Sequence, residues 1–257
     1  MANIVITGAN QGIGYYFTEK ALMDGNKVAV LDLEVDNLKN LAKIFPDSLS
    51  YHTVDVCNEA QMQAAIADII EKSHKIDIAI HNACRCTFDR EAITGINIYE
   101  QVFDVNYYGA LRLVKCVLPY MQAQKGGKVI FTSSGVGVTG FVDISPYASS
   151  KGALEALAKC LNLEYAQDGV SFHIIHPPLT RTKSAEPLPI PKEFMADPKD
   201  VGYGLAKHIS SKRFIICHSF GQKIQTLACY LFPIRMGRLL SKMALRYIDS
   251  EKNKAMS

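Results

Sequence analysis

Tyr147 and Lys151, four residues apart, form the pair in this sequence best suited to proton transfer. Residues at this spacing share one helix face, so the Lys151 ammonium can lie near the Tyr147 phenol. A free phenol has a pKa of about 10, and a neighbouring cation lowers it toward the range needed for acid–base work on an alcohol or carbonyl. Such a pair alone is common on helix surfaces. Ser134, at the end of a predicted buried strand, adds a hydroxyl facing the same crevice.

A glycine-rich turn, GANQGIG at residues 8–14, lies between the first predicted strand and the first predicted helix. Its glycines let the backbone approach a pyrophosphate, and the helix N-terminus supplies N–H groups and a positive dipole end. Asp32 closes the second predicted strand, 18 residues beyond Gly14, where a carboxylate accepts both hydroxyls of an adenosine ribose. It would repel a 2′-phosphate, and Asn10 and Gln11 are neutral. We therefore expect NAD rather than NADP.

These residues need strands and helices to bring them together. Short apolar stretches alternate with stretches of helical periodicity. The predicted strands are residues 4–7, 27–33, 50–54 (the weakest), 75–80, 128–132, 170–176 and 213–217, and the predicted helices include 60–72, 98–124 and 146–167. This order predicts an α/β fold, a doubly wound, Rossmann-like parallel sheet with helices on both faces. The Pro-rich stretch 177–198 predicts a long loop, with 179–198 as a substrate lid.

Composition sets the class of protein. The chain has 257 residues, of which 48% are apolar and 21% charged, as in globular domains and unlike disordered or fibrous chains. Seven scattered cysteines favour a reducing compartment. The apolar stretches fall short of the ~20 residues that span a bilayer, and a strand predicted from Asn3 leaves no room for a signal peptide. We expect a cytoplasmic protein.

The formal charge of +3 predicts no nucleic-acid partner, but it is unevenly distributed. Residues 223–257 contain seven basic and two acidic residues, whereas residues 1–222 contain 21 and 23. Beyond Pro233, apolar and basic residues recur at helical spacing on different sides, which predicts a basic amphipathic helix. We expect a catalytic domain, 1–222, and an extension, 223–257. The extension either packs on its own domain or a subunit partner, or attaches through 223–247 to an anionic membrane surface.

Several motifs together carry a family resemblance. TGANQGIG at residues 7–14 resembles the cofactor turn of short-chain dehydrogenases/reductases of the small single-domain type. Asp55 and Val56 resemble the family's adenine-contacting pair, and HNAC at residues 81–84 resembles its Asn-Asn-Ala-Gly segment. The remaining matches are to the family's catalytic residues: Asn106, Ser134, Tyr147 and Lys151. The resemblance covers residues 3 to 217.

The resemblance implies a mechanism. Tyr147 acts as general acid for carbonyl reduction or as base for alcohol oxidation, while Lys151 lowers its pKa and binds the nicotinamide ribose. Ser134 polarises the substrate oxygen, and Asn106 holds a water that links Lys151 to solvent. Hydride passes between the substrate carbon and the nicotinamide. The resemblance also implies a homodimer or homotetramer, paired through helices 98–124 and 146–167.

The predicted function is therefore that of an NAD(H)-dependent oxidoreductase acting on a secondary alcohol or ketone. Apolar residues in the lid favour a lipid-like or steroid-like substrate. The alternatives are the same chemistry with NADP(H), or a catalytically silent dinucleotide-binding regulator or scaffold. The residues expected to bind the cofactor are Gly8, Asn10, Gln11, Gly12, Ile13, Gly14, Asp32, Asp55, Val56, Asn82, Ala83, Tyr147, Lys151, Pro177 and Thr182.

Two positions depart from the family pattern. Cys84 replaces a glycine, and we expect a buried, inert thiol, with a redox-sensitive one as the alternative. Because His81, Cys84 and Cys86 lack the spacing of a structural zinc site, we expect no metal. Pro178 also replaces a glycine, which predicts a stiffer wall beside the nicotinamide.

Overall fold

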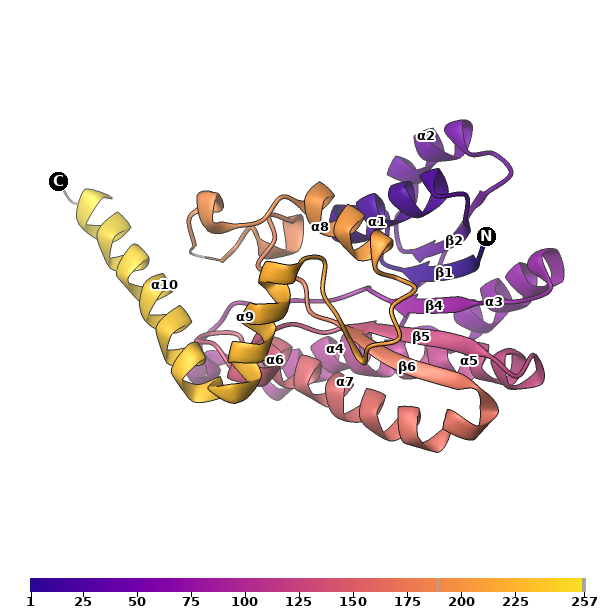
Figure 1. Ribbon diagram of the computed structural model, residues 1–257. Helices are drawn as coiled ribbons and strands as arrows, with labels where there is room; N and C mark the ends of the chain where they lie inside the picture. Colours follow the sequence, from indigo (N-terminus) through magenta and orange to yellow (C-terminus); the bar gives the residue numbers. More distant parts are fainter. Residues whose placement is uncertain (189, 256–257) are drawn as a thin grey trace.

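The computed structural model describes the backbone of residues 1–188 and 190–255, and their side chains as far as residue 247. Seven parallel strands form one sheet in the order β3-β2-β1-β4-β5-β6-β7 (Figure 1). The strands are β1 (Asn3–Thr7), β2 (Lys27–Asp32), β3 (Leu49–Thr53), β4 (Ile78–His81), β5 (Gly127–Thr132), β6 (Val170–Ile175) and β7 (Ile215–Ile216). The predicted doubly wound sheet is confirmed. The order reverses between β1 and β4, which opens a crevice at the carboxyl ends of these strands.

Both faces of the sheet are buried, which explains why the strands are continuous apolar runs. Side chains alternate along β1: Ile4 and Ile6 pack into one core, and Val5 packs into the core on the opposite face. The first core lies under helices α1 (Gly12–Met23), α2 (Asp36–Ile44) and α8 (Pro198–Lys207). The second lies under α3 (Glu59–Ser73), α5 (Gly109–Ala123) and α7 (Ser145–Glu164).

The helix predicted over residues 98–124 is continuous but not regular. It consists of α4 (Ile96–Phe103), a π-helical turn η2 (Asp104–Tyr108) and α5. Single π turns inside α-helices are frequent at functional sites, and this one contains Asn106. Apolar periodicity could not reveal the π turn, because one wide turn barely changes which face is apolar.

Among its described residues, the predicted loop over 177–198 contains two short 3₁₀ turns, η4 (Lys183–Ala185) and η5 (Lys192–Phe194), and we keep the name lid for residues 179–198. Its base is closed by a parallel bridge between Thr180 and Ala196. The Arg181 N–H donates to the Ala196 carbonyl (3.0 Å), and the Ala196 N–H donates to the Leu179 carbonyl (2.8 Å). The remaining short elements are η1 (Glu91–Ile93), α6 (Val136–Thr139) and η3 (Ala166–Asp168).

The C-terminal extension forms two helices, α9 (Phe220–Leu231) and α10 (Pro233–Ala255), at one end of the molecule (Figure 1). The start of α10 packs closely on α6, because a Cβ on Gly237 would lie 2.4 Å from the Thr139 carbonyl oxygen. The Val142 N–H donates to Ser241 Oγ (3.3 Å). The described part of α10 therefore rests on its own domain. Neither α10 nor any other described helix combines the length and apolarity needed to cross a bilayer.

Candidate functional site

One cavity of about 820 Å³ occupies the crevice at the carboxyl ends of the strands. The glycine turn and the ends of β2, β4 and β5 form one part of its wall. The lid and the inner faces of α9 and α10 form the other part. Every predicted cofactor-binding residue lines this cavity except Gly14, and so do Ser134, Tyr147 and Lys151.

The glycine turn approaches the end of β4 more closely than any side chain would allow. Gly8 has φ +67°, and a Cβ there would lie 2.4 Å from Ala83 Cα. A Cβ on Gly14 would lie 2.5 Å from the Gly8 carbonyl oxygen, so this glycine packs behind the turn rather than on the cavity wall. No described side chain caps the N-terminus of α1. A backbone cradle with free N–H groups fits a pyrophosphate.

Asp32 holds the glycine turn against β2. Its Oδ2 accepts a hydrogen bond from the Asn10 N–H at 2.7 Å, and its Oδ1 accepts one from the Glu34 N–H at 3.3 Å. The Asn10 side chain in turn accepts from the Asn37 N–H at 3.0 Å. Asn10 therefore shapes the turn, while the Asp32 carboxylate lies at the cavity wall.

Asn82 connects three strand ends. Its Nδ2 donates to the Gly8 carbonyl (2.6 Å), and its Oδ1 accepts from Thr132 Oγ1 (3.2 Å). The N–H groups of Asn82 and Ala83 both donate to Thr7 Oγ1 (3.1 and 3.2 Å). These bonds fix the segment after β4 to the turn after β1. Asp55 and Val56 line the cavity after β3.

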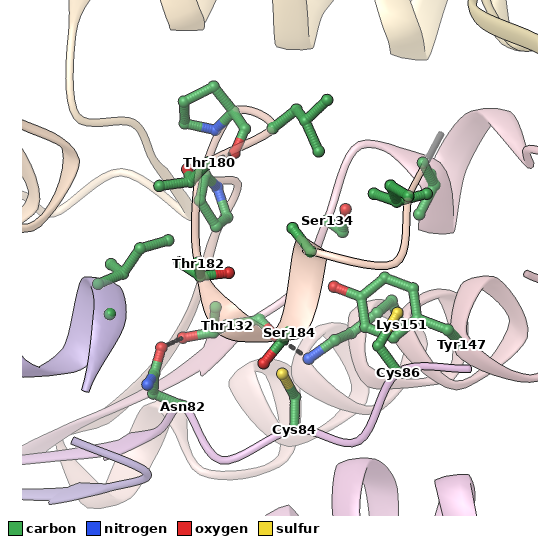
Figure 2. Close-up of a pocket in the computed structure, with 18 of the residues that line it drawn as sticks. Asn82, Cys84, Cys86, Thr132, Ser134, Tyr147, Lys151, Thr180, Thr182 and Ser184 are labelled. Atoms are coloured by element: carbon green, nitrogen blue, oxygen red, sulfur yellow. Dashed lines mark hydrogen bonds between the residues drawn. The ribbon is translucent and has the colours of Figure 1, made fainter. Parts of the chain in front are cut away.

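Tyr147 and Lys151 lie on the first turns of α7, facing the end of β5 (Figure 2). Lys151 Nζ is 5.4 Å from the centre of the Tyr147 ring and donates to the Thr132 carbonyl at 2.7 Å. The Lys151 side chain is almost wholly buried, at 1% exposed. The shared helix face inferred from the spacing is thus present.

The pKa of Tyr147 is shifted opposite to expectation. Burial raises it well above 10, the charges of Cys84 and Cys86 add to this, and the hydrogen bond with Ser134 lowers it only in part. Burial lowers the pKa of Lys151. Desolvation is the largest cause of both pKa shifts, which the residue spacing could not show. A raised pKa favours the neutral phenol of Tyr147, which is the form that can donate a proton.

Asn106 is fully buried and is not among the described residues that line the cavity. Its Oδ1 accepts from the Arg85 N–H (2.7 Å), and its Nδ2 donates to the Arg85 carbonyl (3.0 Å) and to Ser150 Oγ (2.9 Å). The side chain thus fastens the loop after β4 to α7. Its side-chain amide is thus engaged with protein groups, and the water that the family resemblance implies at Asn106 stays a prediction.

The cysteines after β4 differ from expectation. Cys84 is exposed rather than buried, and Cys86 is half-buried. Both line the cavity beside Tyr147 (Figure 2). Burial, followed by the charge of Cys84, raises the pKa of Cys86 to about 12. The glycine-to-cysteine change therefore adds side-chain volume at the cavity wall.

The lid reaches across to the cofactor turn. Thr182 lines the cavity, and a Cβ on Gly12 would lie 3.2 Å from Thr182 Cγ2. Pro177 and Pro178 form the wall between β6 and the lid. Residues after β6 thus lie directly over the glycine turn.

The sequence analysis missed a buried polar cluster on α7, on the side of Lys151 away from the N-terminus of this helix. Glu155, one turn beyond Lys151 and 5% exposed, accepts from Ser133 Oγ (3.0 Å) and from the Tyr230 hydroxyl (2.6 Å). His176 Nε2 lies 3.1 Å from Glu155 Oε1. Burial alone would raise the pKa of Glu155, but His176, Tyr230 and Ser133 together hold it below its ordinary value. Only the polar character of position 155 on a buried face hinted at this cluster.

Residues of the extension were also missing from the predicted site. They line the cavity from α9 and α10: Gln222, Gln225, Thr226, Cys229, Leu240, Met243, Ala244 and Tyr247. The helical periodicity beyond Pro233 predicted the helix but not what its inner face covers.

Comparisons with known proteins agree with this geometry. The family model described as short chain dehydrogenase matches residues 2–192. The chain is 30% identical over 186 residues to 2-(R)-hydroxypropyl-CoM dehydrogenase of Xanthobacter autotrophicus, covering 69% of this chain and 74% of that protein. It is 33% identical over 216 residues to the oxidoreductase UcpA of Salmonella typhimurium, covering 81% and 80%.

A short-chain dehydrogenase from Streptomyces avermitilis has the same fold, with a TM-score of 0.80, 22% identity, and coverage of 95% of this chain and 98% of that one. The family match spans β1 to β6, the glycine turn and most of the lid, which build the cofactor end of the cavity, but not β7, α9 or α10. The chain therefore belongs to the short-chain dehydrogenase/reductase family, whose members are oxidoreductases that use NAD or NADP.

Proposed function

We propose that this protein is an NAD(H)-dependent oxidoreductase that interconverts a secondary alcohol and a ketone. One observation carries the proposal: a single cavity contains both the glycine cradle and the Ser134, Tyr147 and Lys151 side chains. A dinucleotide in the cradle and a substrate beside Tyr147 would thus share one enclosed space. When bound, the nicotinamide supplies the hydride donor or acceptor.

Tyr147 is the proton donor in the reductive direction. Its raised pKa keeps it neutral, so its hydroxyl donates a hydrogen bond to a carbonyl oxygen and then the proton. Ser134, whose hydroxyl pairs with Tyr147, orients and polarises the same oxygen. The Lys151 cation stabilises the phenolate that remains. In the oxidative direction the proton returns to Tyr147.

The residues around the ribose position support NAD. The Asp32 carboxylate lies at the cavity wall with Leu33 and Glu34 beside it. Two acidic side chains would repel a 2′-phosphate, and none of the described residues lining this part of the cavity is basic. We expect NADH to bind more tightly than NADPH, and Asp32→Asn to narrow the difference. Equal dissociation constants in the wild-type protein would contradict the preference.

The substrate end of the cavity supports an apolar alcohol or ketone. It is lined by large apolar side chains from the segment after α6, the lid and α10, among them Phe141, Ile144, Leu188, Phe194, Leu240 and Met243. Burying apolar substrate surface against such walls yields about 25 cal/mol per Å². We therefore expect kcat/KM to rise with chain length in a series of aliphatic ketones. A flat or falling series would exclude a lipid-like substrate.

The decisive experiment is Tyr147→Phe, with Tyr120→Phe on the outer face of α5 as the matched control. Loss of the proton donor should lower turnover by about 100-fold or more. Binding of NADH, followed by fluorescence, should persist because the glycine cradle is untouched. Tyr120→Phe should retain turnover. Undiminished turnover in Tyr147→Phe would overturn the assignment, and no turnover by wild type on any carbonyl would favour a silent dinucleotide-binding protein.

A further inference from the structure

The outer faces of α9 and α10 expose an unusual concentration of apolar side chains. Of the nineteen large hydrophobic side chains that are exposed in the described residues, nine lie between Phe220 and Leu245. They are 45–75% exposed and comprise Phe220, Ile224, Leu227, Leu231, Phe232, Ile234, Leu239, Met243 and Leu245. We call residues 220–247 the basic apolar face. Four members on α9 recur at spacings of three or four residues and so form one stripe.

All the charged residues in the same stretch are basic. It contains five cations, Lys223, Arg235, Arg238, Lys242 and Arg246, and no Asp or Glu. All five are exposed, and none forms an ion pair with another described residue. The four on α10 lie three or four residues apart, which places them on one side of the helix. Exposed apolar and cationic side chains therefore interleave along α10, and α9 adds its apolar stripe and Lys223.

This surface is fixed in place before any partner arrives. The Tyr230 hydroxyl bonds to buried Glu155, which ties α9 to α7. Gly237 packs against Thr139, and Ser241 accepts from the Val142 N–H, which together tie α10 to α6 and to the segment that follows it. Docking through the outer faces would therefore require little ordering of the backbone, which lowers the entropic cost of association.

We propose that the basic apolar face docks this protein on the anionic surface of a lipid bilayer, without crossing it. Apolar side chains gain by entering the headgroup boundary, and each Lys or Arg near an anionic surface adds about 1 kcal/mol. A second copy of this chain fits less well, since it would place five cations opposite five cations of the same sign. Charge complementarity thus selects the anionic bilayer.

The inner sides of the same helices line the cavity, so docking would bring the substrate end close to the bilayer. This step rests on the proposed function. Met243 is 51% exposed and also lines the cavity, as does Phe194 of the lid at 64% exposed. The apolar outer surface is therefore continuous with the apolar wall of the substrate end. An amphiphilic alcohol or ketone could pass from the bilayer to Tyr147 with little exposure of its tail to water.

The test is co-sedimentation of the full-length protein with vesicles of phosphatidylcholine and phosphatidylserine, against phosphatidylcholine alone. We expect binding to the mixed vesicles that weakens with added salt. Arg238→Gln/Lys242→Gln should weaken it about 30-fold, from about 1 kcal/mol for each cation. Ile224→Ser/Leu227→Ser should weaken binding to a similar degree through lost apolar contact. Matched controls on α2, Lys39→Gln/Lys43→Gln and Ile44→Ser, should bind like wild type.

The outcomes separate docking from catalysis. Turnover of a short, water-soluble ketone should be unchanged in all these variants, because none of the substituted residues lines the cavity. The docking proposal would be overturned if the wild-type protein did not bind the mixed vesicles, or if the α2 controls lost as much binding as the α9 and α10 variants. Neither result would affect the proposed oxidoreductase activity. The docking proposal would also be overturned by size-exclusion chromatography in which the α9 and α10 variants dissociate a dimer, since this face would then be a contact between copies.

Discussion

The two ends of the cavity are built in different ways. At the cofactor end, the Asp32 and Asn82 side chains at the ends of adjacent strands hold the glycine turn, and a glycine at position 8 is required by the approach to Ala83. At the substrate end, the lid and the two C-terminal helices are held mainly by isolated contacts such as the bond between Tyr230 and Glu155. The difference teaches that the sheet and α7 position the glycine turn and Tyr147, whereas the wall at the other end consists of segments attached to the sheet's edge and to α6 and α7.

The largest effect should come from Gly8→Ala. A Cβ at this residue would meet the Ala83 backbone at 2.4 Å, and φ is +67°. We expect about 4 kcal/mol of lost stability and no measurable NADH binding. Gly25→Ala is the matched control, since Gly25 has φ +79° but nothing within 4 Å of its Cβ position. It should lose only about 1 kcal/mol in urea denaturation. Similar losses of unfolding free energy in both variants would show that the cost comes from the positive φ, and not from the close approach of Gly8 to Ala83.

The next largest effect is a dependence of folding stability on pH, which arises from His81 at the end of β4. Burial, followed by the charge of Lys151, lowers the pKa of His81 from 6.5 to about 3. Below pH 6.5 the unfolded chain binds a proton that the folded protein does not, so stability falls as pH falls from 6.5 toward 3. Two pH units below 6.5 we expect about 2–3 kcal/mol of loss, and His81→Gln should reduce the slope. Identical slopes in both proteins would contradict this.

At the substrate end, Tyr230→Phe removes one hydrogen bond to a buried carboxylate. We expect about 2 kcal/mol of lost stability, because hydrogen bonds to charged groups contribute about 1.5–3 kcal/mol. Tyr203→Phe is the matched control: its hydroxyl donates to Glu19 (2.7 Å) at the surface, so the loss should be well under 1 kcal/mol. Equal losses of unfolding free energy in the two variants would mean that the burial of Glu155 does not strengthen its hydrogen bond with Tyr230.

Glu155 should also make the stability of the folded protein depend on pH in the acid range. Its folded-state pKa lies below the ordinary 4.5, so its contribution is present above pH 4.5 and is lost as pH falls through the folded value. Glu155→Gln should abolish this part of the acid transition. An unchanged transition, measured by circular dichroism, would exclude Glu155 as its source.

The smallest effect should be at the base of the lid. Arg181 and Asp197 form an ion pair at 3.0 Å, with both side chains about half exposed. Such surface pairs contribute about 0–1 kcal/mol, and the two backbone bonds that Ala196 makes, with Arg181 and with Leu179, persist without the ion pair. Arg181→Gln should therefore change the melting temperature by a few degrees at most and leave KM unaltered. A large rise in KM would show that this pair, not the backbone bridge, sets the lid position.

Much of the cofactor end was predictable because its signals are local. The strand, glycine turn and helix follow one another in the chain, and Tyr147 and Lys151 are one helical turn apart. The substrate end was only partly predictable. Glu155 and Tyr230 are 75 residues apart, and nothing in their neighbourhoods indicates that they meet. The π turn at Asn106 and the exposed Cys84 were missed because both depend on how neighbouring elements pack.

By itself the sequence determined the doubly wound fold, the glycine cradle and the pairing of Tyr147 with Lys151, since periodicity and short spacing are properties of the chain. Only the tertiary structure decided that Tyr147 has a raised pKa, that Asn106 fastens a loop, and that α9 and α10 wall the cavity. Each of these three properties depends on which groups are buried against one another in the folded protein. The desolvation of a group depends on every segment packed around it, and those segments come from distant parts of the chain.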